Sequence, residues 1–446
     1  MRKSIAGFAA AAAFALVAAG CSDPGSSSTA EPTSSSTDGG AMEEHWPAQD
    51  TNRDGVTLTI WAAQNSTQTA QSVADEFETL TGATVNIETI PDPYEQSIQT
   101  KVATGDMPDL AFWQPTGSQL TVLNAKQNLQ SLDGAPWVDS YEPGLADITG
   151  ILDGTRYAAL VTTPAVEGVY YNKDLFEQAG ITDLPTNWDE MIADADTLKA
   201  AGITPFYEMA ADRWATQWWV QVQLADAAAD GLWDRVNANE EAFTDATIQG
   251  AIDNYKALID DGYFNDDIKT ATFIDQGNAL LNDEAAMVMQ VNSYFGQLQS
   301  LTDTATLDEK VGFFPISPSG NVGTFIPDQS NAVVAFATGD DVQEATARQF
   351  LSYWMGDGYQ SFVDTVKTVS LISGVESSSE VPQALLDVAA SVGDSVGSMQ
   401  ALAIANPDLY IYLADMIQGT KTPEQVAEAT QQQFAEFAAA QGAPGF

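Results

Sequence analysis

Aromatic, amide and carboxyl side chains follow the predicted β-strands of this chain at several separate places. They are Trp61, Gln64 and Asn65 after a first strand; Trp113, Gln114 and Thr116 after a third; Asp212, Arg213 and Trp214 after 203–208; Asn292, Tyr294 and Phe295 after 285–290; and Asp328 and Gln329 before 331–337. Rings offer flat apolar faces for stacking, and amide, carboxylate and guanidinium groups exchange hydrogen bonds with hydroxyls. Open α/β sheets place ligands outside the carboxyl ends of their strands. These residues therefore predict a binding site for a ligand with apolar C–H faces and a fringe of hydroxyls, as a sugar has.

Nucleophilic catalysis and zinc binding are disfavoured by the composition. The chain has one histidine, His45, in a polar N-terminal stretch, and one cysteine, Cys21. Ser–His–Asp and Cys–His catalysis need a histidine in the site, and zinc sites need clustered His and Cys. We expect no cofactor, no metal and no catalytic residue.

Two alternatives of other classes stay open at this point. The 62 acidic residues leave room for a secreted glycosidase or lyase with paired carboxylates such as Asp328 and Glu167, although no spacing singles out that pair. The formal net charge of −46 also allows a receptor for a cationic solute such as a polyamine. The same charge excludes nucleic acid as a partner, because phosphate binding needs clustered Lys and Arg.

The N-terminus reads as a secretory leader that ends at a cysteine. Arg2 and Lys3 precede a short apolar run, and LVAAGC then resembles a lipobox with Ala18 where Leu is commonest. This pattern predicts that Cys21 is lipidated, by a diacylglyceryl and an acyl (palmitate) chain. The alternative is ordinary secretion, with Cys21 as a free thiol. We expect a signal peptide at 1–20 and, over 21–53, the lipidated cysteine with a flexible Ser/Thr/Gly/Pro tether.

Strands and helices alternate from residue 56 onward. VTLTIW (56–61), ATVNIETI (83–90) and DLAFW (109–113) read as strands, with helices between them over 67–80 and 94–103. This order predicts a parallel α/β unit.

Later segments continue the mixed pattern. Predicted strands are GVYYN, ITPFYE, AAMVMQ, VGFFPI and NAVVAFA, and predicted helices include KDLFEQA, 188–201, 214–229 and the C-terminal PEQVAEATQQQFAEFAAA. The residues that follow the predicted tether, from 54 to 446, are too many for one compact core, so two lobes are expected.

Several of these segments, in order, resemble the family-1 extracellular solute-binding proteins of ATP-binding-cassette (ABC) importers, the maltose- and oligosaccharide-binding group. The segments are VTLTIWAAQN, TGDMPDLAFW, VEGVYYNKDLFEQAGI, LPTNWDEMIADADTLKAAGITPF, EAAMVMQVNSYFGQL, VGFFPISP and ARQFLSYWMGDGYQSFV. The strand–YNKDLF–helix–Gly element followed by P-x-x-W-D-E is the most specific part.

The resemblance implies an α/β, two-lobed, periplasmic-binding-protein-like fold of type II, with a central ligand cleft and extra C-terminal helices. The N-lobe would comprise 54–164 with 332–372, and the C-lobe 165–331 with 373–446. Chain crossings are expected near Thr163, Asn331 and Ser373.

The resemblance also implies a function and one further site residue. Glu167 matches a position that often reaches the ligand in relatives, and Asn292-Ser293-Tyr294 stands where many relatives have Gly-x-Trp. The implied protein is a monomeric receptor, not an enzyme, that delivers an oligosaccharide to the permease subunits of an ABC importer. Its expected place is the outer face of the cytoplasmic membrane of a Gram-positive bacterium, held by the lipid.

Overall fold

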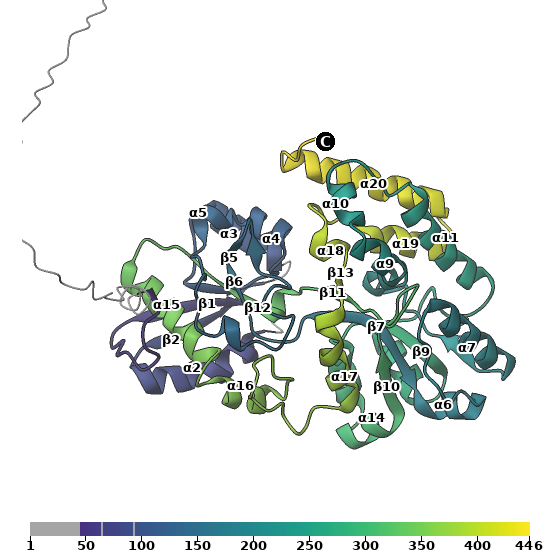
Figure 1. Ribbon diagram of the computed structural model, residues 1–446, viewed down its shortest axis with the longest axis horizontal. Coiled ribbons are helices and arrows are strands. Elements are labelled where there is room, and N and C mark those ends of the chain that lie inside the picture. The colour runs from purple at the N-terminus through teal and green to yellow at the C-terminus, as the bar shows by residue number, and fades with distance from the viewer. Residues whose placement is uncertain (1–44, 64–65, 92–93) are drawn as a thin grey trace, which may run out of the picture.

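A computed structural model describes residues 45–63, 66–91 and 94–446, and these residues form two lobes side by side (Figure 1). The predicted signal peptide, Cys21, the predicted tether up to residue 44, and the predicted ligand residues Gln64 and Asn65 lie outside the described residues. No helix among the described residues is both long and apolar enough to cross a membrane.

The N-lobe is built on a sheet with strand order β2-β1-β3-β12-β6. Its strands are β1 (Thr57–Ala62), β2 (Thr84–Thr89), β3 (Leu110–Phe112), β6 (Ala158–Leu160) and β12 (Ala332–Ala335). The first three pair in parallel, as the strand–helix alternation predicts, and β12 pairs antiparallel to both β3 and β6. The remaining N-lobe elements are α2 (Thr67–Thr81), α3 (Tyr94–Ala103), α4 (Gly117–Val122), α5 (Ala125–Asn128), η1 (Val138–Ser140), the hairpin β4 (Ile151–Leu152) and β5 (Thr155–Arg156), α15 (Asp341–Trp354) and α16 (Tyr359–Val366).

The C-lobe is built on a second sheet with order β13-β11-β7-β9-β8, and β10 pairs with β7. Its strands are β7 (Ala165–Asn172), β8 (Thr204–Phe206), β9 (Ala285–Gln290), β10 (Val311–Phe314), β11 (Thr324–Ile326) and β13 (Val396–Gly397). Its helices up to the crossing back to the N-lobe are α6 (Lys173–Ala179), α7 (Trp188–Ala200), α9 (Ala225–Ala229), α10 (Leu232–Asn237), α11 (Ala246–Asp260), α12 (Phe273–Leu281), α13 (Tyr294–Leu301) and α14 (Thr304–Lys310), with η4 (Gln329–Asn331) at the crossing.

The C-terminal segment is helical, as predicted, and includes the longest helix among the described residues. Its helices are α17 (Gln383–Ser391), η5 (Val392–Asp394), α18 (Met399–Leu402), α19 (Leu409–Gln418) and α20 (Pro423–Ala440). Thr422 and Gln425 form a capping box at the start of α20, with Pro423 in its first turn. In Figure 1, α20 lies over α10, α11 and α19 at the edge of the C-lobe.

One expectation about segments is refined here and another is corrected. The predicted helix over 214–229 is helical throughout, in four consecutive pieces that alternate between 3-10 and α geometry: η2 (Trp214–Gln217), α8 (Trp218–Gln221), η3 (Val222–Leu224) and α9. The pieces are held by long-range bonds that the local pattern does not show, since the Gln400 side chain accepts from Gln221 and donates to Gln217.

Residues 45–53, expected in the tether, pack on the N-lobe instead. Trp46 lies against Trp137 with 5.2 Å between ring centroids. The Gln349 amide of α15 donates to the carbonyls of Gln49 and Thr51 at 2.9 and 2.8 Å. The apolar Trp46 and these amide bonds are why the segment is ordered.

Candidate functional site

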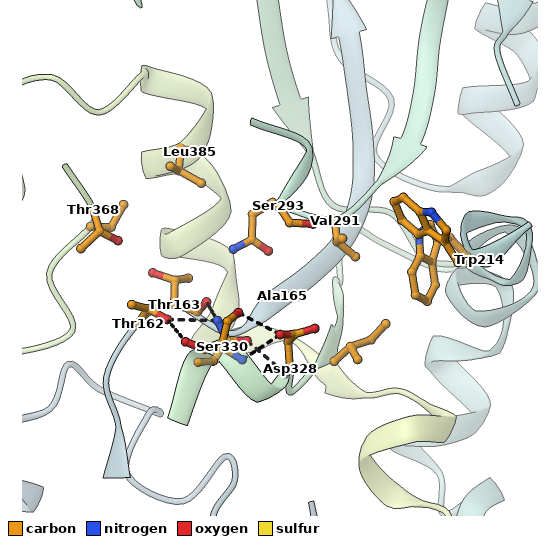
Figure 2. Close-up of a pocket in the computed structure, with 15 residues that line it drawn as sticks. Thr162, Thr163, Ala165, Trp214, Val291, Ser293, Asp328, Ser330, Thr368 and Leu385 are labelled. Atoms are coloured by element: carbon orange, nitrogen blue, oxygen red, sulfur yellow. Dashed lines mark hydrogen bonds between the residues drawn. The ribbon is translucent and has the colours of Figure 1, made fainter. Parts of the chain in front are cut away.

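Three chain crossings join the lobes, and a cavity lies against all of them. The crossings run between β6 and β7, between β11 and β12, and between α16 and α17. The interlobe cavity has a volume of about 510 Å³, within the usual range for small-molecule sites (Figure 2). Fifteen residues line it: Thr162, Thr163, Ala165, Trp214, Trp218, Val291, Asn292, Ser293, Ile326, Asp328, Ser330, Asn331, Thr368, Val369 and Leu385.

Hydrogen bonds between the first two crossings fix the floor of this cavity. Asn331 Nδ2 donates to Thr162 Oγ1 at 3.1 Å and to the Thr163 carbonyl at 3.0 Å. The Asp328 backbone N–H donates to Asn331 Oδ1 at 3.0 Å. Asp328 Oδ1 accepts from both the N–H and the hydroxyl of Ser330 at 2.8 Å (Figure 2). The sequence between β11 and β12 thus holds one carboxylate rigidly at the cavity.

Several polar atoms in the lining stay free for a ligand. Among the hydrogen bonds between described residues, none uses Asp328 Oδ2 or the hydroxyls of Ser293 and Thr368. Asn292 Oδ1 accepts from the Val166 N–H at 3.0 Å, which leaves the Asn292 amide hydrogens free within the described structure. The lining contains no Lys, Arg or His. This mixture of one acceptor carboxylate, one amide donor and hydroxyls suits an uncharged polyhydroxy ligand.

Two indoles form the C-lobe wall. Trp214 and Trp218 lie 6.3 Å apart between ring centroids, at 65° to each other. Figure 2 shows Trp214 across the cavity from Thr368 and Leu385. Arg213, just before Trp214, has φ 66° and ψ −51°, and the Trp214 N–H donates to the Asp212 carbonyl at 2.7 Å. This is the rare γ-turn with positive φ, a strained backbone conformation. It fixes the position of Trp214 at the start of η2.

Of the predicted ligand residues, Trp214, Asn292 and Asp328 line the interlobe cavity. Gln114, Asp212, Arg213 and Gln329 do not. The Gln114 amide donates to the Pro327 carbonyl at 2.8 Å, and Asp212 Oδ2 accepts from the Phe273 N–H at 2.6 Å. Arg213 is exposed, and Gln329 Oε1 is buried with no partner among the described residues.

The N-lobe tryptophans are core residues, which corrects their expected part as stacking platforms. Trp61 is 2% exposed and Trp113 is fully buried. Trp61 Nε1 donates to Glu88 at 3.2 Å, and Trp113 Nε1 donates to the Gln119 carbonyl at 3.1 Å. Thr116 is buried too, because its hydroxyl caps α4. The indole N–H groups of Trp61 and Trp113 have acceptors within the N-lobe, so neither ring is exposed to the interlobe cavity.

Tyr294 and Phe295 are also buried, so neither ring faces the interlobe cavity. Both pack edge-on against Tyr170 of β7, at centroid distances of 5.4 and 5.3 Å. The Tyr294 hydroxyl donates to the Gln276 carbonyl at 3.1 Å, and burial raises its pKa well above the ordinary value. Of the residues predicted for the site in this loop, only Asn292 lines the interlobe cavity, beside its neighbours Val291 and Ser293.

Glu167 lies beneath the cavity rather than on its wall. Side chains alternate along a strand, so Glu167 faces the same side of β7 as the lining residue Ala165. It lies two residues further along the strand, away from the crossing. It stands opposite Thr324 of β11. Both Glu167 carboxylate oxygens and the Thr324 hydroxyl are buried without a partner among the described residues. Burial raises the pKa of Glu167 well above the ordinary value, because desolvation disfavours the charged carboxylate.

Half of the lining residues absent from the predicted set lie on the crossings. Thr162, Thr163, Ser330 and Asn331 lie on the first two crossings, and Thr368 and Val369 lie on the third. The predicted crossings near Thr163 and Asn331 carried the signal for four of them. Trp218 shows no such signal, because only tertiary packing distinguishes it from its neighbour Trp219.

A family model described as "Bacterial extracellular solute-binding protein" matches residues 63–361 of this chain. Among curated proteins, a Brucella abortus protein described only as a binding protein is 26% identical over 273 residues, 59% of this chain and 63% of that protein. The "Alpha-glucosides-binding periplasmic protein AglE" of Rhizobium meliloti is 27% identical over 245 residues, half of each chain. The "Multiple sugar-binding protein" of Streptococcus mutans is 23% identical over 43% of this chain and 46% of its own. This chain therefore spans less than two thirds of the length of these relatives.

Solved structures share the fold over most of the chain. The apo form of RafE from Streptococcus pneumoniae matches with a TM-score of 0.72 at 20% identity, over 86% of this chain and 98% of its own. A chitin oligosaccharide binding protein matches with a TM-score of 0.68 at 21% identity, over 87% and 100%. The two-lobed α/β fold is thus that of solved solute-binding structures.

Proposed function

The chain belongs to the bacterial extracellular solute-binding proteins, and within that family we propose that it is the receptor of an ABC importer for a carbohydrate, an oligosaccharide. The sugar binds in the interlobe cavity, hinge motion of the lobes closes on it, and the closed form delivers it to the membrane permease. The protein acts as a monomer and catalyses no reaction.

The observation that carries this proposal is the composition of the interlobe cavity. Two indoles form one wall, hydroxyls and amides from the chain crossings form the floor, and the lining has a single charged side chain, Asp328. A sugar ring would place a C–H face on an indole and donate a hydroxyl to Asp328 Oδ2. Relatives named for α-glucosides and multiple sugars, and a RafE structure with raffinose, support the same ligand class.

The test is a thermal-shift panel on the purified protein with three nested sugar series. These are galactose–melibiose–raffinose, glucose–maltose–maltotriose and N-acetylglucosamine–chitobiose–chitotriose, with spermidine and amino acids as comparisons. We expect at least one sugar series to raise Tm at millimolar concentration. If only spermidine raises it, the ligand is cationic. If no sugar raises it, the carbohydrate assignment fails.

A carboxylate-dependent glycosidase or lyase finds no support in the positions of the two carboxyls. Asp328 lines the cavity, whereas Glu167 is fully buried beneath it, so the two do not flank a common space. Chromatography of a sugar incubated with the protein tests this directly. We expect unchanged sugar, and hydrolysis products would establish the enzyme instead.

For the N-terminus we propose removal of residues 1–20 and lipidation of Cys21. Both belong to a protein held on the outer face of the cytoplasmic membrane of a Gram-positive bacterium. Cys21→Ala should release the protein into the medium with its sugar affinity unchanged. A variant that stays with the membrane fraction would contradict the lipid anchor.

A further inference from the structure

A second cavity of about 570 Å³ lies beside the interlobe cavity. Thr163 and Val369, from the first and third crossings, line both spaces. We call this second space the hinge cavity. A loop of the N-lobe with Glu142 forms one wall, and α17 of the C-lobe, with Leu386 and Ala389, forms the other.

The two cavities meet along the start of α17. Leu385 lines the interlobe cavity and the next residue, Leu386, lines the hinge cavity, as neighbours about 100° apart on a helix can. Two glycines that line the hinge cavity, Gly144 and Gly393, bring the backbones of the two lobes close together. A Cβ built on Gly144 of the N-lobe would lie 3.0 Å from Cα of Gly393 of the C-lobe.

Thr163 leaves an unused polar group at the junction. Its side chain is 5% exposed, and its Oγ1 atom is buried without a partner among the described residues. A buried hydroxyl without a hydrogen bond is destabilising. A ligand that spans both cavities would pass this residue, since Thr163 lines both.

The lining of the hinge cavity differs from that of the interlobe cavity. It contains no aromatic ring and no Lys, Arg or His. Aliphatic side chains such as Leu386 cover its walls, and the exposed carboxylates of Glu142 and Asp394 stand at its rim. Such a space accepts C–H surfaces and hydroxyl donors and repels anions.

We propose that the hinge cavity is a second subsite, which binds a further unit of a neutral oligosaccharide whose first unit lies against Trp214 and Trp218. This inference rests on the proposed function. It makes the receptor selective for chain length, because a single sugar unit fills only the interlobe cavity. It also excludes sugars that carry a carboxylate or phosphate on the second unit.

The test is calorimetric titration of the purified protein with whichever nested sugar series the panel selects. Ala389→Trp places an indole in the hinge cavity. Asp387→Trp is the matched control, since Asp387 is an exposed residue of the same helix that lines neither cavity. We expect wild-type affinity to rise at least tenfold from the single unit to the longest member. Ala389→Trp should lose this gain yet bind the single unit within threefold of wild type, and Asp387→Trp should match wild type.

Three results would overturn the subsite alone: wild-type affinity that does not rise with length, an Ala389→Trp variant that binds the longest member as wild type does, or one that weakens all lengths equally. The last result would mean that the indole blocks lobe closure. If no sugar binds the wild type, the proposed function fails, and the subsite fails with it.

Discussion

Each lobe has a pair of tryptophans near the edge that faces the other lobe, yet only the C-lobe pair lines the interlobe cavity. Trp61 and Trp113 of the N-lobe are buried, and their N–H groups have acceptors within the lobe. Trp214 and Trp218 lie in short helical pieces after a strained turn. The position of a tryptophan at the end of a strand thus places it at the edge of the lobe. The conformation of the segment that follows then determines whether its ring packs into the core or lines the cavity.

The largest expected effect is on stability and comes from the N-lobe tryptophans. Trp113→Ala removes a fully buried indole from the N-lobe, which costs about 3–5 kcal/mol of unfolding free energy. Denaturant unfolding measures this loss, and Trp113→Phe should lose less. Sugar affinity of the folded variant should stay within twofold of wild type. A large loss of affinity at unchanged stability would return Trp113 to the site.

The second prediction concerns a buried carboxyl of the C-lobe core. Burial raises the pKa of Glu208 from 4.5 to about 7, although its carboxylate accepts from the Met209 N–H and the Tyr255 hydroxyl. Between these values the folded protein holds a proton that the unfolded chain has released. Stability should therefore fall as pH rises from 4.5 to 7, by about 3 kcal/mol for this one group.

The contribution of Glu208 to the pH dependence of stability is isolated by comparing wild type with Glu208→Gln in denaturant unfolding at pH 4.5 and 7.5. The variant should lack this part of the pH dependence. Equal slopes for both proteins would mean that Glu208 does not titrate in this window.

The third prediction separates the two carboxyls nearest the interlobe cavity. Asp328→Asn keeps an oxygen to accept from Ser330 and replaces the free Oδ2, so sugar affinity should fall about 10–100-fold, or roughly 1.5–3 kcal/mol. Glu167→Gln should leave affinity within threefold, because Glu167 is buried beneath the wall. Titration of both variants with the same sugar gives the comparison, and reversed effects would exchange their roles.

The smallest effect should come from the turn before Trp214. Arg213→Gly relieves the positive φ, whereas Arg213→Ala keeps it, and both remove the charge. The glycine variant should be about 1 kcal/mol more stable than the alanine variant in denaturant unfolding. Equal stability would show that the turn carries no strain.

Much of the fold could be predicted from sequence because its elements are long and periodic. The bounds of α3 and α20 coincide with the predicted helices, and the parallel start of the N-lobe follows from strand–helix alternation. Three-residue β11 lacks any period and was not predicted, although it forms one side of the second crossing.

The site was harder to predict because burial there is decided by distant partners. Asn292 and Tyr294 are two residues apart, yet only Asn292 reaches the interlobe cavity, since Tyr294 bonds to Gln276 of α12. Trp218 and Trp219 likewise look alike in sequence. Trp219 packs against Tyr255 of α11, a contact that only the folded chain provides.

If the C-lobe indoles hold the sugar, removing both should abolish most of the affinity. The decisive measurement is calorimetric titration of a Trp214→Ala/Trp218→Ala double variant with the tightest-binding sugar of the panel, beside wild type and a Trp61→Phe/Trp113→Phe control. We predict saturable one-site binding by wild type and control, and at least 100-fold weaker binding by the double variant. Undiminished binding by the double variant would show that the C-lobe indoles do not hold the sugar.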